Sequence, residues 1–198
     1  MQVDTGRIGQ SDDKQQVILT AAMAAFAQYG FRRVSMDEIA KRAGMSRAAL
    51  YLHFRNKEDI LSTGVRIFFA RAAEDLETAL SSGASLEDAI RLGCFSTAGD
   101  MARFLLDSPH GEEMLQIKTG EVPAHVAEGE ARMHGIWTEW LEHEAAAGRV
   151  HLPKGGAASV ATAIIAGQYG QKASAAGYDD YIARLEVYAE MMGRALRA

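Results

Sequence analysis

The residues best suited to chemistry lie between positions 35 and 58. Ser35 and Glu38 have the spacing of a capping box, in which two side chains satisfy free backbone amides at a helix start. Ser46 can cap a second helix in a similar way. Gly44 lies between the two helices, where the chain must turn with a positive φ. Two short capped helices joined by a glycine turn predict a helix-turn-helix motif.

The second helix of this motif carries side chains that could recognise DNA. It would bury Leu50 on one face, and the residues it would expose are Arg47, Ala48, Tyr51 and His53. These side chains are short or can form hydrogen bonds, which suits the wall of a DNA groove. The chemistry expected here is therefore noncovalent recognition rather than bond making.

The charge of the chain is distributed unevenly. Its 198 residues hold 21 Lys and Arg against 26 Asp and Glu, which gives a net charge of −5. Residues 1–60 hold nine basic and seven acidic side chains, net +2, whereas residues 61–198 hold twelve and nineteen, net −7. Because electrostatic recognition is local, the N-terminal third can still accept a polyanion.

Composition excludes several classes of protein. Apolar residues make up 48% and charged residues 24%, as in ordinary globular chains. A single cysteine, Cys94, excludes an intrachain disulfide framework and a cysteine-based zinc finger. There is no signal-peptide pattern, and the nearest approach to a membrane span, the uncharged residues 155–171, contains four glycines and fits a span poorly. We therefore expect a cytoplasmic protein without a cofactor.

Helical periodicity recurs along the whole chain, and no stretch has the pattern of a strand. The sequence predicts an all-α fold of about nine helices, one of them covering residues 85–107. Residues 1–10 contain two glycines and no apolar period, so we expect a flexible arm, with Ser11 capping the first helix. Residues 11–60 would form the helix-turn-helix domain and residues 61–198 a C-terminal helical bundle.

The motif and its flanks resemble the N-terminal signature of the TetR family of transcriptional regulators. The resemblance covers about residues 11–61 and is specific as a combination, whereas beyond residue 61 only the layout of helices is similar. The matching residues are Phe26, Tyr29, Gly30, Phe31, Ile39, Ala40, Ala43, Gly44, Ser46, Leu50, Tyr51, His53, Phe54, Asn56, Lys57, Glu58, Ile60 and Leu61.

The resemblance implies that the second helix of the motif lies in the major groove. Arg47, Ala48 and Ala49 would face bases. The side chains of Tyr51, His53 and Lys57 would contact phosphates. Many family members carry Gly and Thr or Ser where this chain has Ala48 and Ala49, which leaves contact with a thymine methyl as one option. The predicted DNA-binding residues are Ser35, Ser46, Arg47, Ala48, Ala49, Tyr51, His53 and Lys57.

Each of these residues also has a structural alternative. Arg47 could be a solvated surface arginine, Tyr51 could cover the edge of the core, and His53 could cap a helix end. Lys57 could pair with the glutamate that follows it. The arginine pair at 32–33 flanks the motif and could touch the DNA backbone.

Family members use the C-terminal bundle to bind a small ligand and to form dimers, and the resemblance implies both for residues 61–198. Aromatic and methionine side chains on several helix faces could line a pocket, because methionine adapts to irregular shapes. Each of these side chains could equally be buried in the hydrophobic core without lining a pocket. The predicted pocket residues are Phe68, Phe69, Met101, Phe104, Met114, Met133, Trp137 and Trp140, and the candidate polar contacts are Cys94, His110, His134 and Tyr169.

The last two predicted helices, 156–176 and 179–197, would form a twofold dimer interface. Small residues on the first allow close backbone approach, and apolar side chains on the second supply bulk. The alternative is that helix 156–176 is the central core helix of a monomer. The predicted interface residues are Ala163, Ile164, Gly167, Tyr169, Gly170, Leu185, Tyr188 and Met192.

These features predict a repressor that a small hydrophobic or aromatic ligand releases from a palindromic operator. Its partners would be double-stranded DNA, a second copy of the chain and the effector, with no membrane. One alternative is a helix-turn-helix activator or chromosome-organising factor. Another is an all-helical enzyme or lipid carrier, which no nucleophile elbow or phosphate loop supports. Glu139 and His143 share a helix face, but the spacing of a compact metal site is missing.

Overall fold

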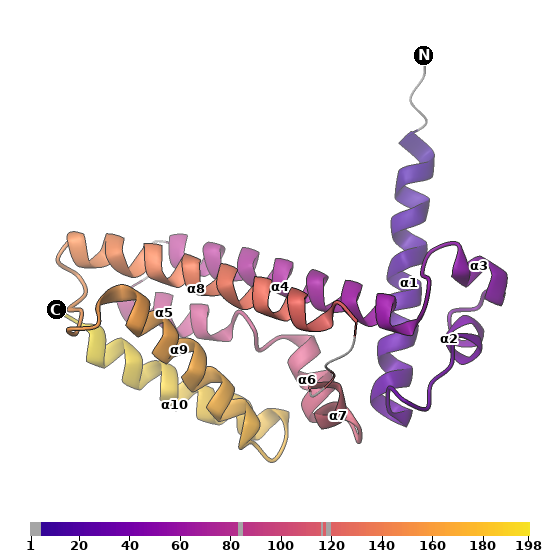
Figure 1. Ribbon diagram of the computed structural model, residues 1–198. Helices are drawn as coiled ribbons and strands as arrows, with labels where there is room; N and C mark the ends of the chain where they lie inside the picture. Colours follow the sequence, from indigo (N-terminus) through magenta and orange to yellow (C-terminus); the bar gives the residue numbers. More distant parts are fainter. Residues whose placement is uncertain (1–4, 83–84, 116, 118–119) are drawn as a thin grey trace. The chain divides into compact units, whose positions relative to one another are not determined.

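The computed structural model describes residues 5–82, 85–115, 117 and 120–198, and this part of the chain is helical (Figure 1). Its β-structure is limited to one isolated bridge between Val150 and Arg197. The all-α class is confirmed. The helices are α1 (Thr5–Tyr29), α2 (Met36–Arg42), α3 (Arg47–Tyr51), α4 (Lys57–Ser81), α5 (Leu86–Phe95), α6 (Asp100–Leu106), α7 (Gly111–Leu115), α8 (Val122–Ala146), α9 (Gly156–Ala173) and α10 (Tyr178–Leu196).

The chain folds into two compact units. One comprises the described residues up to 66 together with 108–125, and the other comprises residues 67–107 and 126–198. The sequence-based division differs, because it assigns all of 61–198 to a single bundle. Segment 108–125 joins the first unit through the amide of His110, which donates to the Ala27 carbonyl at 3.2 Å. The Arg32 amide likewise donates to a Glu113 carboxylate oxygen at 3.4 Å.

The first unit is built around the end of α1. The rings of Phe26 and Phe31 meet edge to face at 5.0 Å between centroids, and Ile39, Leu50 and Ile60 are fully buried. Burial of aromatic and branched side chains is the main favourable term in a unit of this size. The helices α2 and α3 are thereby held against α1 and the start of α4.

The predicted start of the first helix is wrong. The helix α1 begins at Thr5, so Ser11 lies inside it instead of capping it. Residues 5–10 are helical where the sequence indicated a flexible arm, and residues 1–4 lie outside the described part. A glycine inside a helix costs about 1 kcal/mol relative to alanine, which a helix of 25 residues can absorb.

The second unit packs α10 against α5 and α9 (Figure 1). Its largest fully buried side chains include Trp137, Tyr181, Ile164 and Leu185. The Trp137 ring lies so close to Gly93 of α5 that a Cβ there would come within 2.6 Å of its Cη2 atom. Gly93 is therefore a requirement of core packing.

The single helix expected over residues 85–107 is also wrong, because the chain forms α5 and α6 with a break between them. Tight turns end α5, with the Ser96 amide donating to Gly93 and the Ala98 amide to Phe95. The carbonyl of Cys94 accepts a hydrogen bond from the Gln168 side-chain amide at 2.9 Å. A long-range side chain thus satisfies a backbone group at the break, which local periodicity does not reveal.

We predict that Gly93→Ala destabilises the protein by about 1–3 kcal/mol, because the added methyl group collides with Trp137. Gly135→Ala on α8 is the matched control, since nothing lies within 4 Å of a Cβ at that position. The control should gain about 1 kcal/mol from helix propensity. Urea denaturation followed by circular dichroism measures both, and equal effects of the two substitutions would contradict this packing.

Candidate DNA-binding surface and interior cavity

The helix-turn-helix has the geometry that its sequence predicts. The Ser35 hydroxyl accepts from the Glu38 amide at 3.2 Å, and the Ser46 hydroxyl accepts from the Ala49 amide at 3.1 Å. Gly44 takes a φ of +68° between α2 and α3, with no atom within 4 Å of a Cβ. Glycine is required there by backbone conformation rather than by lack of space. The two serines act as helix caps, and their role toward DNA stays a prediction.

The helix α3 presents a polar, exposed face. Leu50 is fully buried, whereas Arg47, Ala48 and Tyr51 are exposed. The Arg47 guanidinium lies 3.0 Å from an Asp37 carboxylate oxygen and 5.5 Å from the centroid of the Tyr51 ring. Contact with the Tyr51 hydroxyl and then the Asp37 charge raise the pKa of Arg47, which keeps it cationic. Because this ion pair is solvent-exposed, it is weak and can be exchanged for a contact with DNA.

The structure gives Lys57 a different position from the one predicted. Its Nζ donates hydrogen bonds to the carbonyls of Phe31, Val34 and Arg32 at 2.8, 3.0 and 3.1 Å. It also lies 4.8 Å from the centroid of the Phe31 ring. An ammonium group has three protons, so this arrangement occupies all of them. Lys57 is therefore a structural residue that joins the turn after α1 to α4, and not a free phosphate ligand.

The remaining predicted DNA-binding residues are partly covered, because the side chains of Ala49 and His53 are half-buried. Leu52, directly after α3, is 85% exposed and was not predicted. Arg55 is also exposed, and its Nε lies 3.5 Å from an Asp59 carboxylate oxygen. Leu52 and Arg55 are exposed because they lie in the short turn between α3 and α4. The sequence predicts where this turn is, but not which of its side chains face solvent.

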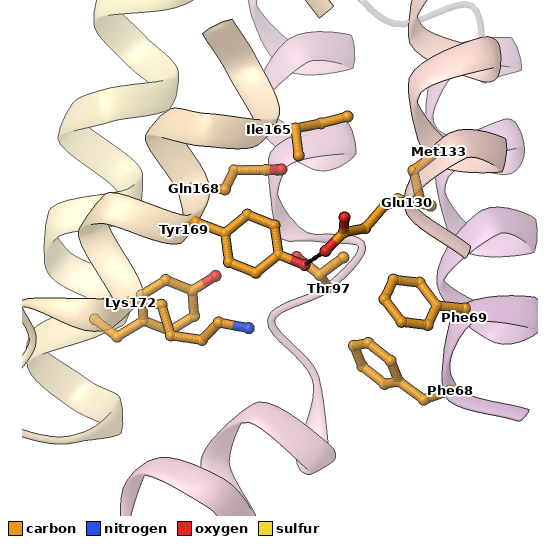
Figure 2. A pocket seen from close by; sticks show the side chains of 10 residues that line it. Phe68, Phe69, Thr97, Glu130, Met133, Ile165, Gln168, Tyr169 and Lys172 are labelled. Atoms are coloured by element: carbon orange, nitrogen blue, oxygen red, sulfur yellow. Dashed lines mark hydrogen bonds between the residues drawn. The ribbon is translucent and has the colours of Figure 1, made fainter. Parts of the chain in front are cut away.

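The second unit contains a small interior cavity of about 30 Å³ (Figure 2). It lies among α4, α8, α9 and α10, together with the break after α5. Three of the predicted pocket residues line it: Phe68, Phe69 and Met133. The other lining residues were not predicted as pocket walls and are Thr97, Glu130, Ile165, Gln168, Tyr169, Lys172 and Tyr181.

Several predicted pocket residues lie elsewhere. Trp137 is fully buried in the core, edge to face with Trp140 at 5.9 Å between centroids. Met114 is buried in the first unit, and neither Met101 nor Phe104 of α6 lines the cavity. Aromatic and methionine side chains signal burial, and burial in a close-packed core is commoner than a pocket wall.

The polar side of the cavity is formed by residues of α8 and α9. The Tyr169 hydroxyl donates to Glu130 Oε1 at 2.7 Å, and the Lys172 ammonium lies 5.3 Å from the centroid of the Tyr169 ring (Figure 2). Burial lowers the pKa of Lys172, against the attraction of Glu130. Burial, and then the bond to Glu130, raise the pKa of Tyr169. Burial also raises the pKa of Tyr181 to about 12, so both phenols are neutral donors at pH 7.

The other candidate polar contacts are distributed over the molecule. His134 Nε2 lies 3.0 Å from the Ala158 carbonyl oxygen and 3.1 Å from Thr162 Oγ1, beside an open groove between α8 and α9. His110 belongs to the first unit. Burial raises the pKa of Cys94 to about 12, which leaves its thiol protonated and unreactive. Among the described residues, no three His, Cys, Asp or Glu side chains are grouped to hold a metal ion.

The predicted dimer face is partly used within one chain. Ile164 and Leu185 are fully buried and face the core, so they are wrong as interface residues. The Tyr188 hydroxyl donates to the Ala163 carbonyl at 2.9 Å, and its ring fills the space beside Gly167. A charged side chain at position 167 would therefore disrupt the packing of α9 on α10 within one chain. Such a substitution does not test a dimer interface specifically.

The surface of α9 and α10 still offers an apolar face to a partner. Ala163, Tyr169 and Gly170 of α9 are exposed, and α10 exposes 58% of Val187 and 64% of Met191. The sequence-based interface missed these last two residues. Val187 and Met191 are four positions apart, so the sequence already places them on one face of a helix.

Residues 18–63 match the family described as bacterial regulatory proteins, tetR family. The chain is 42% identical over 53 residues to the HTH-type transcriptional regulator AcrR of Shigella flexneri, covering 27% of this chain and 25% of that protein. It is 30% identical over 83 residues to the fatty acid metabolism regulator protein of Bacillus subtilis, covering 42% and 43%. The chain thus matches between a quarter and less than half of the length of these curated relatives.

Solved structures extend the likeness over the whole fold. The regulator FadR of Bacillus subtilis, in complex with stearoyl-CoA, has a TM-score of 0.72 and 19% identity over 91% of this chain and 98% of that chain. A complex of SmeT with triclosan has a TM-score of 0.69 and 18% identity over 94% and 92%. Motif and family match agree over residues 18–63, which carry the tetR-family segment, and the whole chain has the fold of these solved regulators. In the part of the chain described, no helix is long and apolar enough to cross a membrane.

We predict that Lys57→Met lowers the free energy of unfolding by about 1–3 kcal/mol, because three carbonyls lose their donor. Lys41→Met, at an exposed position of α2, is the control and should change stability by less than about 0.5 kcal/mol. Urea denaturation measures the difference. If both variants were as stable as the wild type, Lys57 would not have the structural role described.

Proposed function

We propose that the chain is a DNA-binding transcriptional repressor that leaves its operator when a small ligand binds. The observation that carries this proposal is the capped helix-turn-helix whose short α3 presents Arg47 and Ala48 to solvent. The family match to residues 18–63 supports it. The curated relatives are regulators, so we propose no catalytic role, and DNA binding would place the protein in the cytoplasm. An activator would use the same surface, and transcription from the target promoter with and without the protein distinguishes the two.

DNA recognition would begin with the exchange of one ion pair. Arg47 leaves the exposed Asp37 carboxylate for a guanine edge, where a bidentate contact is favourable. Ala48 and Ala49 allow α3 to approach the base edges closely. Tyr51 and His53 would reach phosphates on the groove wall. The surplus of basic residues in 1–60 supports this contact, although the whole chain is acidic.

A twofold dimer would place two such motifs on one palindromic operator. The small exposed residues of α9, Ala163 and Gly170, allow a second copy to approach closely. The exposed Val187 and Met191 of α10 supply apolar area at the same face. A stable interface needs more than about 1,000 Å² of buried surface, and four helices can supply it.

A ligand can release the operator only if it binds one dimer arrangement more tightly than another. The cavity of the second unit is the place where such a ligand would bind. Two structural relatives are complexes with stearoyl-CoA and with triclosan, and each of these ligands has an apolar portion, an acyl chain or aromatic rings. The apolar wall of Phe68, Phe69 and Met133 supports a similar class here.

We predict that Arg47→Ala weakens binding to the operator by about 1–3 kcal/mol, which is roughly 5- to 150-fold, and relaxes the preference at one base position. Fluorescence anisotropy on an operator selected from genomic DNA measures this. The matched control is Arg91→Ala, which removes an exposed, ion-paired arginine of the second unit and should leave the affinity unchanged. Equal affinity of Arg47→Ala and the wild type would overturn the proposed docking of α3.

We predict that the double substitution Val187→Glu and Met191→Glu gives monomers, because four charges would face one another across the twofold axis. Light scattering should then report the mass of one chain, and operator binding should be lost while helix content is kept. The control is Leu92→Glu, at an exposed apolar position of α5. A double variant that remains dimeric would contradict this interface.

A further inference from the structure

The cavity and the open groove of the second unit share one wall. Glu130, Ile165 and Tyr169 line the interior cavity of about 30 Å³ and also the groove of about 590 Å³ between α8 and α9. The hydrogen bond from Tyr169 to Glu130 joins the two helices across this wall. Opening that bond would join the cavity to the groove through this wall.

Of the two charged side chains that line the cavity, Glu130 accepts a hydrogen bond and Lys172 has no ion-pair partner among the described residues. Glu130 accepts the Tyr169 hydroxyl at 2.7 Å. Lys172 contacts the Tyr169 ring, but no carboxylate of the described residues forms an ion pair with it. Figure 2 shows its ammonium group pointing into the space that Glu130 and Tyr169 border. Burial lowers the pKa of Lys172, which means that its charge lacks the stabilisation that a bound anion would supply.

The opposite wall is apolar. Phe68 and Phe69 meet edge to face at 5.2 Å between centroids, and Met133 completes this side. A ligand that satisfies both walls must therefore have a charged head and an apolar body. A cationic head would compete with the Tyr169 hydroxyl for Glu130, whereas an anionic head can reach Lys172 without breaking an ion pair of the described residues, since Glu130 acts on Lys172 only through its charge.

We propose that this cavity binds an amphipathic carboxylate, with the carboxylate on Lys172 and the apolar body along Phe68, Phe69 and Met133. The proposal names the ligand class of the regulator proposed above and rests on that function for its consequence at DNA. A cavity of about 30 Å³ holds roughly one water molecule, so the structure is the closed form. Binding opens the Tyr169–Glu130 wall and enlarges the cavity into the groove.

The test is calorimetry on the full-length protein with three probes of equal chain length: decanoate, decanol and decyltrimethylammonium. The wild type should bind decanoate at least tenfold more tightly than either other probe. Lys172→Met should remove this preference while keeping the affinity for decanol, and Lys172→Arg should retain part of it. Lys154→Met, an exposed lysine before α9, is the charge-matched control and should behave like the wild type.

The entry route has its own readout. Tyr169→Phe keeps the ring and removes the hydrogen bond to Glu130, so stopped-flow association of decanoate should be several-fold faster. The preference for decanoate over decanol should remain. Circular dichroism and thermal unfolding establish that each variant is folded, and Lys172→Gln replaces Lys172→Met if the latter is not.

Two outcomes would overturn the proposal. One is wild-type protein that binds the three probes equally or binds none of them, and the other is a Lys172→Met variant that keeps the preference for decanoate. Operator binding is measured separately by anisotropy. Loss of operator binding in the wild type with intact, Lys172-dependent binding of decanoate would reject the repressor function and leave the carboxylate site standing.

Discussion

The three hydrogen bonds of the Lys57 ammonium group are the constraint on which the DNA-binding unit depends. They gather the carbonyls of Phe31, Arg32 and Val34, which lie between α1 and α2, onto the first residue of α4. Such carbonyls would otherwise lack partners where the chain leaves one helix for the next. Lys57 thereby joins the two ends of the segment that contains α2 and α3.

The second unit is organised by a different balance, between close packing and an incomplete polar site. Trp137 over Gly93 fills the core so tightly that a single methyl group has no room. The helix α8, which carries Trp137, also borders the cavity. There Lys172 has no ion pair with a described carboxylate, and the Tyr169 hydroxyl donates a hydrogen bond to Glu130 between α9 and α8. In the proposed response to a ligand, only the polar wall would have to move, because the core beside it is closely packed.

The sequence predicted what local chemistry determines. The caps at Ser35 and Ser46, the glycine turn and the all-α class follow from patterns within a few residues, and each is confirmed. The cavity did not follow, because Glu130, Tyr169 and Lys172 come from two helices and look like solvated polar positions when read alone. Lys57 was interpreted as a phosphate contact for the same reason: its partners lie more than twenty positions earlier in the chain.

Apolar periodicity in the sequence was also used to predict pocket and interface residues, which it cannot distinguish from core residues. Trp137, Ile164 and Leu185 are buried, as their periodicity indicates, but burial alone does not distinguish a core from a pocket or an interface. That distinction needs the arrangement of the helices. In contrast, the exposure of Val187 and Met191 could have been predicted from the sequence, since both lie outside the core-facing stripe of α10.

The most direct measurement of the central claim is a hydroxyl-radical footprint of the full-length protein on DNA selected from genomic fragments. A twofold dimer that places α3 of each copy in the major groove should protect two symmetric segments. Their centres should be separated by about 34–36 Å, or a multiple of that distance, along one face of the duplex. Protection of a single segment, or uniform protection that does not depend on sequence, would contradict the account.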